Sequence, residues 1–314
     1  MKKILLIALL VSLLALASGC YVPSNARADV GDYNGNDFLA KIDDKTPLSQ
    51  IALPGTHDSG ATRDFFIPAT ARCQWMTIGE QLDAGVRYMD IRLKRVNGNL
   101  DIYHGPAYQG ISVDDVLQQV FDFFAQNPSE TLIMCIKEEG DPKGENAELC
   151  EMVKEAIDKT ANKWFTENRI PTLGEVRGKI VLMRRYWAPT DSATAIGFDA
   201  SSGWADTTTF TLESGNYKLA CQDHYQLDNH QDKWKSVSNF FDEMKNAQSD
   251  TYYLNNTSGY IPGLFDIPNL NKICKPINPQ LVAYLKNAKD IKGIIACDHI
   301  TCEIAKEIIA LNFK

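Results

Sequence analysis

The feature that most constrains the fold is a series of short, apolar, β-rich runs separated by helical patterns. These runs lie at residues 51–53, 86–93, 100–103, 131–136, 179–184, 218–221, 251–254 and 293–297. Two of them, 131–136 and 293–297, are almost continuously apolar, as expected for parallel strands that are covered on both faces. Roughly eight strands interleaved with helices predict an α/β fold, a (β/α)8 barrel of the TIM type.

Five segments repeat apolar residues at helical spacing and carry polar residues on the opposite face: 113–126, 146–165, 233–247, 279–288 and 303–311. The helical layer is incomplete, however. Only a short polar link joins residues 93 and 100, and residues 185–217 show little helical pattern. We therefore expect a distorted barrel. No repeat or break in composition divides it, so residues 29–314 are expected to form a single catalytic domain.

The N-terminus has the pattern of a processing segment for export. Lys2 and Lys3 precede an apolar run at residues 4–17, which is too short for a comfortable membrane span. Two cleavage sites compete. Residues 17–20 resemble a bacterial lipobox ending at Cys20, which favours a lipid-anchored lipoprotein of the cell envelope; cleavage after Ala28 would instead release a secreted protein. Residues 1–28 are excluded from the fold in either case.

Composition narrows the partners. A net charge of −8 without a Lys/Arg cluster argues against nucleic acid as a partner, and we expect a monomer. Besides Cys20, the chain has cysteines at positions 73, 135, 150, 221, 274, 297 and 302. Their number is odd, and none has the spacing of a zinc site. We expect mostly buried thiols and predict no disulfide.

Two histidines stand where apolar runs end. His57 follows the run 51–53 within a Gly/Pro-punctuated loop and precedes Asp58, and His104 follows the run 100–103. The strand between them carries Asp90 and Arg92. A rigid strand that ends at a histidine is a common way to hold a general base. The combination of two histidines with an arginine and carboxylates indicates acid–base chemistry on a phosphate.

Catalytic groups of such barrels lie at the C-terminal ends of the strands. The residues that follow the other runs are mostly polar or charged: Lys137, Glu138, Glu139, Arg184, Arg185, Asp223, Tyr225, Asn255, Asn256, Asp298 and His299. Two histidines across one pocket can act as base and acid near neutral pH. Each needs a carboxylate, for which Asp58 and Asp298 are candidates, and Arg92 offers a planar fork that matches phosphate oxygens.

The sequence resembles bacterial phosphatidylinositol-specific phospholipase C, of the X-domain phosphodiesterase family. The resemblance covers residues 45–300 and rests on the motifs Pro54-Gly-Thr-His-Asp-Ser-Gly60, Met89-Asp-Ile-Arg92, Tyr103-His-Gly-Pro106, Lys179-Ile-Val-Leu-Met-Arg-Arg-Tyr186, Gln222-Asp-His-Tyr225 and Asp298. It implies a barrel enzyme that cleaves phosphatidylinositol to diacylglycerol and inositol 1,2-cyclic phosphate.

The resemblance also implies catalytic roles. His57 would be the general base for the inositol 2-hydroxyl, supported by Asp298. His104 would be the general acid for the departing diacylglycerol oxygen, supported by Asp58. Arg92, supported by Asp90, would stabilise the phosphoryl charge.

The inositol pocket is implied in the same way. Lys137, Arg185, Asp223 and Tyr225 would form it, although the register of Arg184 and Arg185 leaves room for a slip by one residue.

The resemblance implies no metal and no cofactor, because Arg92 stands where related calcium enzymes place a carboxylate ligand. Two alternatives stay open. Glu138 and Glu139 could bind a divalent metal in a hydrolase of glycerophosphodiesters or sphingomyelin, although a solvated or salt-bridged pair is the simpler interpretation. The second alternative is a non-catalytic surface lipoprotein that binds inositol or phosphate.

Access to a lipid is expected to use aromatic residues on the barrel rim: residues 65–68, Trp75, Trp187 and Trp204. Packing under long loops is the alternative for each of them. The expected partners are a membrane surface, bound peripherally, and phosphatidylinositol or a GPI-type lipid within it.

Overall fold

The computed structural model describes residues 34–64, 66–140, 146–263 and 267–314. The predicted processing segment 1–28, with Cys20 and both candidate cleavage sites, lies outside the described residues. Within these ranges, no helix combines the length and the hydropathy that crossing a membrane requires.

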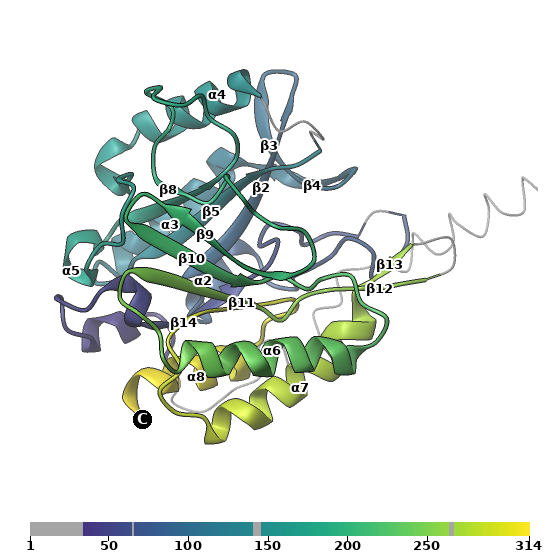
Figure 1. Cartoon of the computed structure of the whole chain (residues 1–314). Helices are drawn as coiled ribbons and strands as arrows, with labels where there is room; N and C mark the ends of the chain where they lie inside the picture. The colour runs from purple at the N-terminus through teal and green to yellow at the C-terminus, as the bar shows by residue number, and fades with distance from the viewer. Residues whose placement is uncertain (1–33, 65, 141–145, 264–266) are drawn as a thin grey trace, which may run out of the picture.

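A curled, mostly parallel sheet forms the centre of the molecule (Figure 1). Its strands follow one another in the order β6 (Trp164–Phe165), β7 (Ile180–Arg185), β5 (Leu132–Glu138), β2 (Tyr88–Val96), β1 (Ala52–Thr56), β14 (Gly293–Cys297), β11 (Thr251–Asn256), β10 (Tyr217–Gln222) and β9 (Thr209–Ser214). Neighbouring strands in this order are parallel except β9 and β10, which are antiparallel. The predicted TIM-type α/β barrel is confirmed.

The barrel is distorted where β7 and β10 would otherwise be joined. The two-residue strand β8 (Phe198–Asp199) pairs with β7, and β9 pairs with β10. Between them, the backbone amide of Asp199 donates a hydrogen bond to the Ser214 hydroxyl (2.9 Å). The chain between β7 and β10 contains β8 and β9 where a complete barrel would have a helix. The incomplete helical layer therefore lies where the sequence predicted it.

The prediction of a barrel strand at residues 100–103 is wrong. These residues belong to β3 (Asn99–His104), which is antiparallel both to β2 and to β4 (Ala107–Ser112). The turn between β2 and β3 is Asn97-Gly98, and both residues have positive φ angles, 50° and 80°. Asn-Gly with this geometry joins antiparallel strands in a two-residue hairpin, so the turn sequence was the signal for the reversal.

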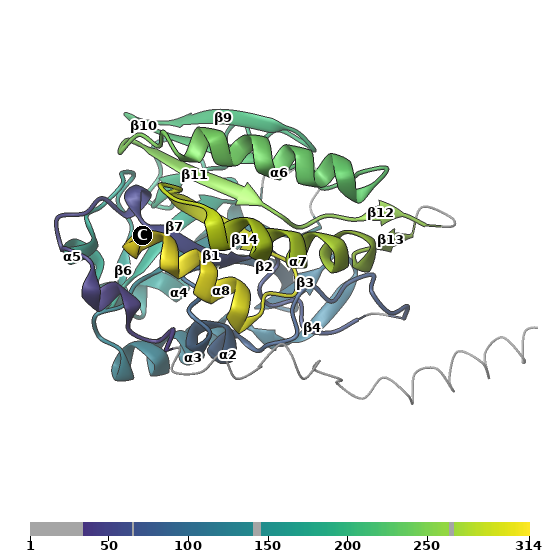
Figure 2. The ribbon, with the colours of Figure 1, turned by 90° about the horizontal axis from the view of Figure 1, so that it is seen from below.

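Helices cover the outside of the sheet: α2 (Ile78–Asp83), α3 (Val113–Gln126), α4 (Ala147–Asp158), α5 (Leu173–Val176), α6 (His230–Met244), α7 (Asn271–Asn287) and α8 (Cys302–Ala310). Helices α6, α7 and α8 lie side by side along one flank (Figure 2). Short 3-10 turns form at Phe38–Lys41, Leu48–Gln50, Ala161–Lys163 and Leu311–Phe313. A small hairpin, β12 (Ile261–Pro262) and β13 (Pro268–Asn269), projects beyond the sheet.

Two predicted helices have different bounds in the structure. The helix expected at 146–165 ends at Asp158. Trp164, which was expected within it, is instead buried in the core as part of β6. The helix expected at 279–288 begins earlier, at Asn271, and contains Pro276 and Pro279. Each proline removes a backbone hydrogen bond. The buried apolar stripe of α7 offsets this loss.

Both faces of the central sheet are buried, which explains its continuously apolar strands. On β5, Ile133 and Cys135 pack inside the barrel, whereas Met134 and Ile136 pack against the helices. The seven cysteines of the described chain are free thiols, and all but Cys302 are buried, as expected.

Candidate active site

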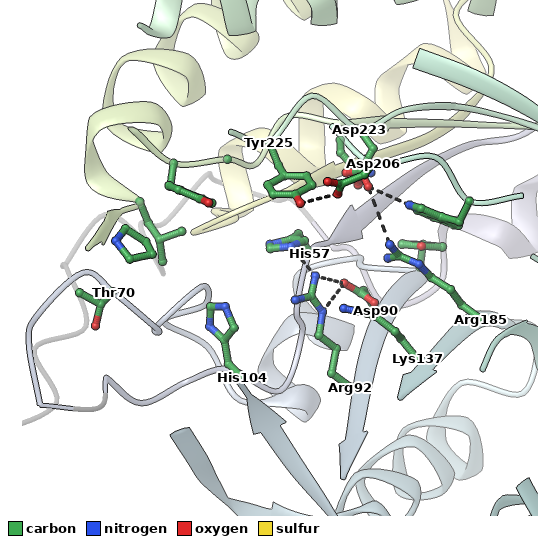
Figure 3. Close-up of a pocket in the computed structure, with 17 residues that line it drawn as sticks. His57, Thr70, Asp90, Arg92, His104, Lys137, Arg185, Asp206, Asp223 and Tyr225 are labelled. Atoms are coloured by element: carbon green, nitrogen blue, oxygen red, sulfur yellow. Dashed lines mark hydrogen bonds and ion pairs between the residues drawn. The ribbon is translucent and has the colours of Figure 1, made fainter. Parts of the chain in front are cut away.

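A cavity of about 250 Å³ opens at the C-terminal ends of the parallel strands (Figure 3). It is lined by His57, Thr70, Tyr88, Asp90, Arg92, His104, Lys137, Arg185, Trp204, Asp206, Asp223, Tyr225, Asn256, Gly259, Tyr260, Pro268 and Leu270. Eight of the ten predicted site residues are in this lining. The other two, Asp58 and Asp298, are buried and contact the lining histidines from behind.

The pair of His57 and Asp298 follows from strand register. Strands β1 and β14 are adjacent and parallel, with Thr56 opposite Cys297, so the next residue of each strand is His57 and Asp298. Their side chains meet at 2.8 Å between Nδ1 and Oδ1. Burial lowers the pKa of His57, and so does Arg92, but the charge and the hydrogen bond of Asp298 together with the charge of Asp90 outweigh them, and the net pKa is raised. The structure thus brings together a histidine and the carboxylate expected to support it.

Arg92 lies at the centre of a cluster of carboxylates. Its Nε and Nη2 donate to Oδ2 of Asp90 at 3.2 and 3.1 Å, and its Nη1 lies 3.3 Å from Oδ2 of Asp58. Burial lowers the pKa of Arg92, but the two aspartates raise it well above its ordinary value. Burial likewise raises the pKa of Asp90, but Arg92 and the other positive groups around it, Arg185 and Lys137 among them, together lower it below its ordinary value. The guanidinium is therefore a permanent, fixed positive charge.

Arg92 also fixes the protonation of His57. Nη2 of Arg92 lies 2.7 Å from Nε2 of His57. A guanidinium has no acceptor, so Arg92 is the donor and Nε2 accepts with its lone pair. In this arrangement, the nitrogen of His57 that faces the cavity carries no proton, which is the state required of a general base.

His104 reaches the cavity by a different route from the one predicted. It ends β3, and because β3 runs back along β2, with Ile102 opposite Leu93, His104 returns toward the middle of β2. Its Nδ1 lies 2.7 Å from the carbonyl oxygen of Ala71. A carbonyl only accepts, so Nδ1 carries the proton in this contact. The other ring nitrogen, Nε2, is the one left to exchange a proton with a substrate.

The expected support of His104 by Asp58 is a long contact. Oδ2 of Asp58 lies 3.8 Å from Nδ1 of His104, which is an ion-pair distance and not a hydrogen bond. Asp58 is fully buried, has a positive φ of 42°, and neither carboxylate oxygen accepts a hydrogen bond from the described residues. Burial raises the pKa of this carboxyl, while Arg92 and His104 oppose the rise. Its influence on His104 is therefore electrostatic. The main-chain carbonyl of Ala71 could not have been found from residue type.

Lys137 and Glu139 extend the charged floor of the cavity. Lys137 donates to Oε2 of Glu139 (3.2 Å), and Glu139 also accepts from the Gly105 amide (2.8 Å) and lies 3.9 Å from Arg92. Burial raises the pKa of Glu139, but Arg92 and Lys137 lower it to about 2. Glu138 points elsewhere and accepts from Asn146 (2.7 Å). The two glutamates do not converge, and Glu139 is salt-bridged, as the simpler interpretation predicted.

The other wall combines Arg185, Asp223 and Trp204. The Arg185 guanidinium stacks on the Trp204 ring at 3.4 Å from its centroid and lies 3.9 Å from Asp223. Asp223 accepts from Nε1 of Trp204 (3.0 Å) and from Nδ2 of Asn256 (3.0 Å). Arg184, whose side chain alternates to the other face of β7, pairs with Asp199 at 2.6 Å. The choice of Arg185 over Arg184 is thus consistent with the geometry.

Tyr225 completes this wall, and its hydroxyl donates to Asp206 at 2.5 Å. Sequence reasoning missed Asp206 and the pocket position of Trp204. Asn256 was named among the polar residues that follow the strands but was given no role in the site. Asp206 and Trp204 follow β8, a strand of two residues that no periodicity reveals.

The aromatic residues expected on the rim divide into two groups. Trp204 is part of the pocket wall, and Trp75 stacks on the buried ring of His299 at 4.5 Å; these two and Trp187 are half-buried. Phe66 is 75% exposed and Ile67 is 46% exposed. Phe65, named with them, lies outside the described residues.

A metal would find ligand types here but little room. In the described residues, two groups of three side chains have their possible ligand atoms close enough together to hold one metal ion. They are His57, Cys73 and Asp298, and Asp58, Cys73 and His104. In the first group, Nδ1 of His57 and Oδ1 of Asp298 are already joined by a hydrogen bond of 2.8 Å. The carboxylates Asp58, Asp90 and Glu139 surround the Arg92 guanidinium, which occupies the place of a cation among them.

Comparison with known proteins agrees with this geometry. Residues 45–186 match the family model described as phosphatidylinositol-specific phospholipase C, X domain. A 1-phosphatidylinositol phosphodiesterase from Listeria monocytogenes is 36% identical over 156 residues, which are 46% of this chain and 47% of that protein. One from Staphylococcus aureus is 28% identical over 312 residues, which are 95% of this chain and 94% of that protein.

Solved structures extend the match to the whole barrel. A phosphatidylinositol-specific phospholipase C from Staphylococcus aureus superposes with a TM-score of 0.77 at 26% identity, covering 88% of this chain and 96% of that one. Another structure of the Staphylococcus aureus enzyme, described for the modulation of its membrane binding, has a TM-score of 0.76 at 26% identity and covers 88% and 97%. Residues 45–186 of the chain therefore belong to the phosphatidylinositol-specific phospholipase C X-domain family, and the barrel as a whole has the fold of these bacterial enzymes.

Proposed function

We propose that this protein is a phosphatidylinositol-specific phospholipase C that cleaves phosphatidylinositol to diacylglycerol and inositol 1,2-cyclic phosphate. The observation that carries the proposal is that His57, His104 and Arg92 all end at one cavity (Figure 3). Two imidazoles and a guanidinium around one phosphoryl group supply a base, an acid and a charge stabiliser.

In the first half of the proposed reaction, Nε2 of His57 removes the proton from the inositol 2-hydroxyl. The oxygen then attacks phosphorus and closes the five-membered cyclic phosphate. Asp298 stabilises the imidazolium that forms, because its buried carboxylate is hydrogen-bonded to Nδ1. The 2.7 Å contact between Arg92 and Nε2 must yield for this step, and the substrate phosphate is a better acceptor for the guanidinium than a neutral imidazole.

In the second half, the P–O bond to diacylglycerol breaks and the departing oxygen takes a proton from Nε2 of His104. For this step His104 must be an imidazolium. The buried Asp58 side chain lies 3.8 Å from Nδ1, and the Ala71 carbonyl holds the ring in place. Arg92 stabilises the charge on the phosphoryl oxygens throughout, with Asp90 fixing the orientation of the guanidinium.

The inositol ring is proposed to lie against the wall made by Lys137, Arg185, Asp223 and Tyr225. Charged donors and acceptors on this wall match ring hydroxyls, and the tyrosine ring offers a face for the sugar-like ring. The cavity lining also includes Pro268 and Leu270, and Tyr260, whose ring lies 6.1 Å from that of Tyr225; these less polar side chains suit the glycerol end of the lipid.

The proposed partner is a membrane that contains phosphatidylinositol or a GPI-type lipid, bound peripherally by a monomer. Phe66 and Ile67 support this surface because they are exposed on the loop that carries Thr70 into the cavity. Ala69 of this loop accepts a hydrogen bond from Leu270 (3.1 Å), which joins it to the segment after β13. Export through the N-terminal segment, with lipid anchoring at Cys20 favoured over cleavage after Ala28, is also a proposal.

The decisive experiment incubates the protein with phosphatidylinositol vesicles in excess chelator and follows phosphorus by NMR. We expect a cyclic phosphate signal at an undiminished rate. A rate abolished by chelator would favour the metal-dependent phosphodiesterase alternative. Binding of inositol or phosphate without any turnover would favour the non-catalytic alternative.

A further inference from the structure

A buried lysine lies directly behind the proposed inositol-binding wall. Lys233 is fully buried on α6, where it begins the core-facing stripe that continues through Val237 and Phe240. A buried ammonium is costly because it loses its hydration. The first turn of a helix adds to this cost, since the helix N-terminus carries a partial positive charge. A lysine retained in this place calls for an explanation.

The contacts of Lys233 lead to the segment that carries Asp223 and Tyr225. Its Nζ donates to the carbonyl oxygen of His224 (2.7 Å) and to Oε1 of Gln222 (3.3 Å). Both acceptors are neutral oxygens. The ammonium thus holds the main chain between the two proposed inositol-binding side chains.

The second contact sets the orientation of a buried amide. Oε1 of Gln222 accepts from Lys233 and from the backbone amide of His224 (2.9 Å). Nε2 of Gln222 donates to Oδ1 of Asn255 (2.9 Å) and to the carbonyl oxygen of Asn256 (2.7 Å). With two donors on its oxygen and two acceptors on its nitrogen, the Gln222 amide has only one favourable orientation.

The chain of hydrogen bonds ends at the cavity. Nδ2 of Asn256, whose carbonyl Gln222 holds, donates to Oδ1 of Asp223 at 3.0 Å. The ammonium is therefore connected to the Asp223 carboxylate by two routes, through Gln222 and Asn256 and through the His224 main chain.

We propose that Lys233 is a positioning residue for the inositol-binding wall, acting on Asp223 and Tyr225 through this buried network. The inference rests on the proposed function, because it assigns Asp223 and Tyr225 to the binding of the inositol ring. The lysine does not touch the substrate. Its effect is on binding and not on the proton transfers at His57 and His104.

The electrostatic surroundings are consistent with this role. The titratable groups around Lys233 are Cys221 and Asp223 at the end of β10, His224 next to them, and Cys297 and Asp298 at the end of β14. Burial lowers the pKa of Lys233 to about 8, against the pull of these groups. The lysine is thus charged at neutral pH and neutral in alkaline solution, where its hydrogen bonds weaken.

The same shift makes the lysine unfavourable for stability. The unfolded chain holds the proton up to the ordinary pKa of 10.5, while the folded chain releases it near pH 8. The free energy of unfolding therefore rises with pH across this window, and at neutral pH the charged lysine destabilises the fold. A residue kept for packing alone would not show this opposition between stability and binding.

The test is Lys233→Met, assayed with a soluble inositol 1-phosphate diester, whose cleavage releases the same cyclic phosphate, and with myo-inositol as a binding probe. We expect KM and the inositol Kd to rise about tenfold while kcat stays within about threefold, because a charge-assisted network is lost but the catalytic groups remain. The wild type should show a KM that rises above pH 8, and the variant should lose this alkaline rise. Its Tm at pH 7 should be unchanged or higher.

A second variant tests the network with the lysine in place. Gln222→Glu puts a carboxylate beside the ammonium and removes the Nε2 donors to Asn255 and Asn256. It should raise KM at neutral pH, because the route through Asn256 is lost, and move the alkaline rise in KM upward by about one pH unit, because the carboxylate raises the lysine pKa. Glu130→Gln, at the opposite end of the barrel, is the stability control and should lower Tm without changing KM.

The outcomes separate the two proposals. Lys233→Met with an unchanged KM, inositol Kd and alkaline profile overturns the inference, and so does a fall in Tm with kcat reduced and KM preserved. If the wild type cleaves neither phosphatidylinositol in vesicles nor the soluble ester, the proposed function fails. The positioning role is then decided by the inositol Kd alone, and an unchanged or undetectable affinity overturns it.

Discussion

The barrel holds a buried or nearly buried arginine at each end, and the two differ in how completely the polar groups around them are hydrogen-bonded. Arg87, at the N-terminal end of β2, pairs with Glu130 at 2.9 Å. Its remaining N–H groups reach the carbonyl oxygens of Leu82, Val86, Gly35 and Asn36 at 2.8 to 3.1 Å. Every donor of this guanidinium has a protein acceptor.

Arg92, five residues further along the chain, lies in a cluster of carboxylates whose oxygens are not all hydrogen-bonded. Both carboxylate oxygens of Asp58, Oδ1 of Asp90 and Oδ2 of Asp298 accept no hydrogen bond from the described residues, although all three side chains are buried. A satisfied network locks a structure, whereas an unsatisfied one retains donors and acceptors for a ligand. The comparison assigns the N-terminal end of the barrel to stability and the C-terminal end to chemistry.

Removing a histidine at the C-terminal end should have the largest effect. His57→Ala and His104→Ala are each expected to lower kcat by about 10²- to 10⁴-fold, because each removes a proton-transfer group. Initial rates on vesicles and thermal denaturation measure this. The folded state should persist in both, and a variant with near-full activity would remove that histidine from the mechanism.

The two arginines can be exchanged for lysine as a matched pair. Arg92→Lys should lower kcat by about 10²- to 10³-fold with little change in stability, because a point charge cannot replace the fork over the phosphoryl oxygens. Arg87→Lys should leave the rate unchanged and lower the free energy of unfolding by about 3 kcal/mol or more, since buried carbonyls lose their donors. Urea titrations and rates at one pH measure both. Equal losses of activity in the two variants would erase the distinction between the ends.

The pH dependence should respond to Asp298. A general base works unprotonated, so the rate falls as pH drops through the His57 pKa, which Asp298 raises above 6.5. Asp298→Asn should move this acid limb of kcat/KM to lower pH and reduce the plateau. The raised pKa also stabilises the fold at pH below 6.5, a contribution lost as pH rises through the folded value. An acid limb that does not move would leave Asp298 without its proposed role.

The smallest expected effect is at the rim. Phe66→Ser should weaken vesicle binding by about tenfold, the loss expected for one apolar side chain, and leave the turnover of a soluble inositol 1-phosphate diester unchanged. Trp75→Ala is the contrasting variant, because this ring packs on His299 and its loss should lower Tm. Vesicle sedimentation and soluble turnover separate the two. Equal loss of both activities in Phe66→Ser would indicate a folding defect.

Much of the site could be predicted because residue type and chain position agree. His57 and Asp298 follow adjacent parallel strands, and the register that pairs Thr56 with Cys297 brings them together. His104 was found for an incomplete reason, since its strand is antiparallel to the barrel strand beside it. Its position depends on the Asn97-Gly98 turn. This local signal was not used, because residues 100–103 were counted as a strand of the barrel.

The remainder of the site depends on contacts between distant segments. Trp204 and Asp206 follow a strand of two residues, too short for any period to be read. The acceptor of His104 is the carbonyl oxygen of Ala71, and every residue has a carbonyl. Lys233 does carry a signal, a charged residue at a core-facing helical position, but its partners come from β10 and from the segment that follows it.

By itself, the sequence determined the barrel and the identity of its reactive groups. Periodicity reports which faces are buried, and the ionisable side chains after each strand report what chemistry is possible. The tertiary structure decided which of these groups meet, which nitrogen of each histidine faces the cavity, and which charged cluster keeps oxygens without a hydrogen bond. Those outcomes depend on strand register, chain reversal and desolvation, and each is a property of residues that lie far apart in the chain.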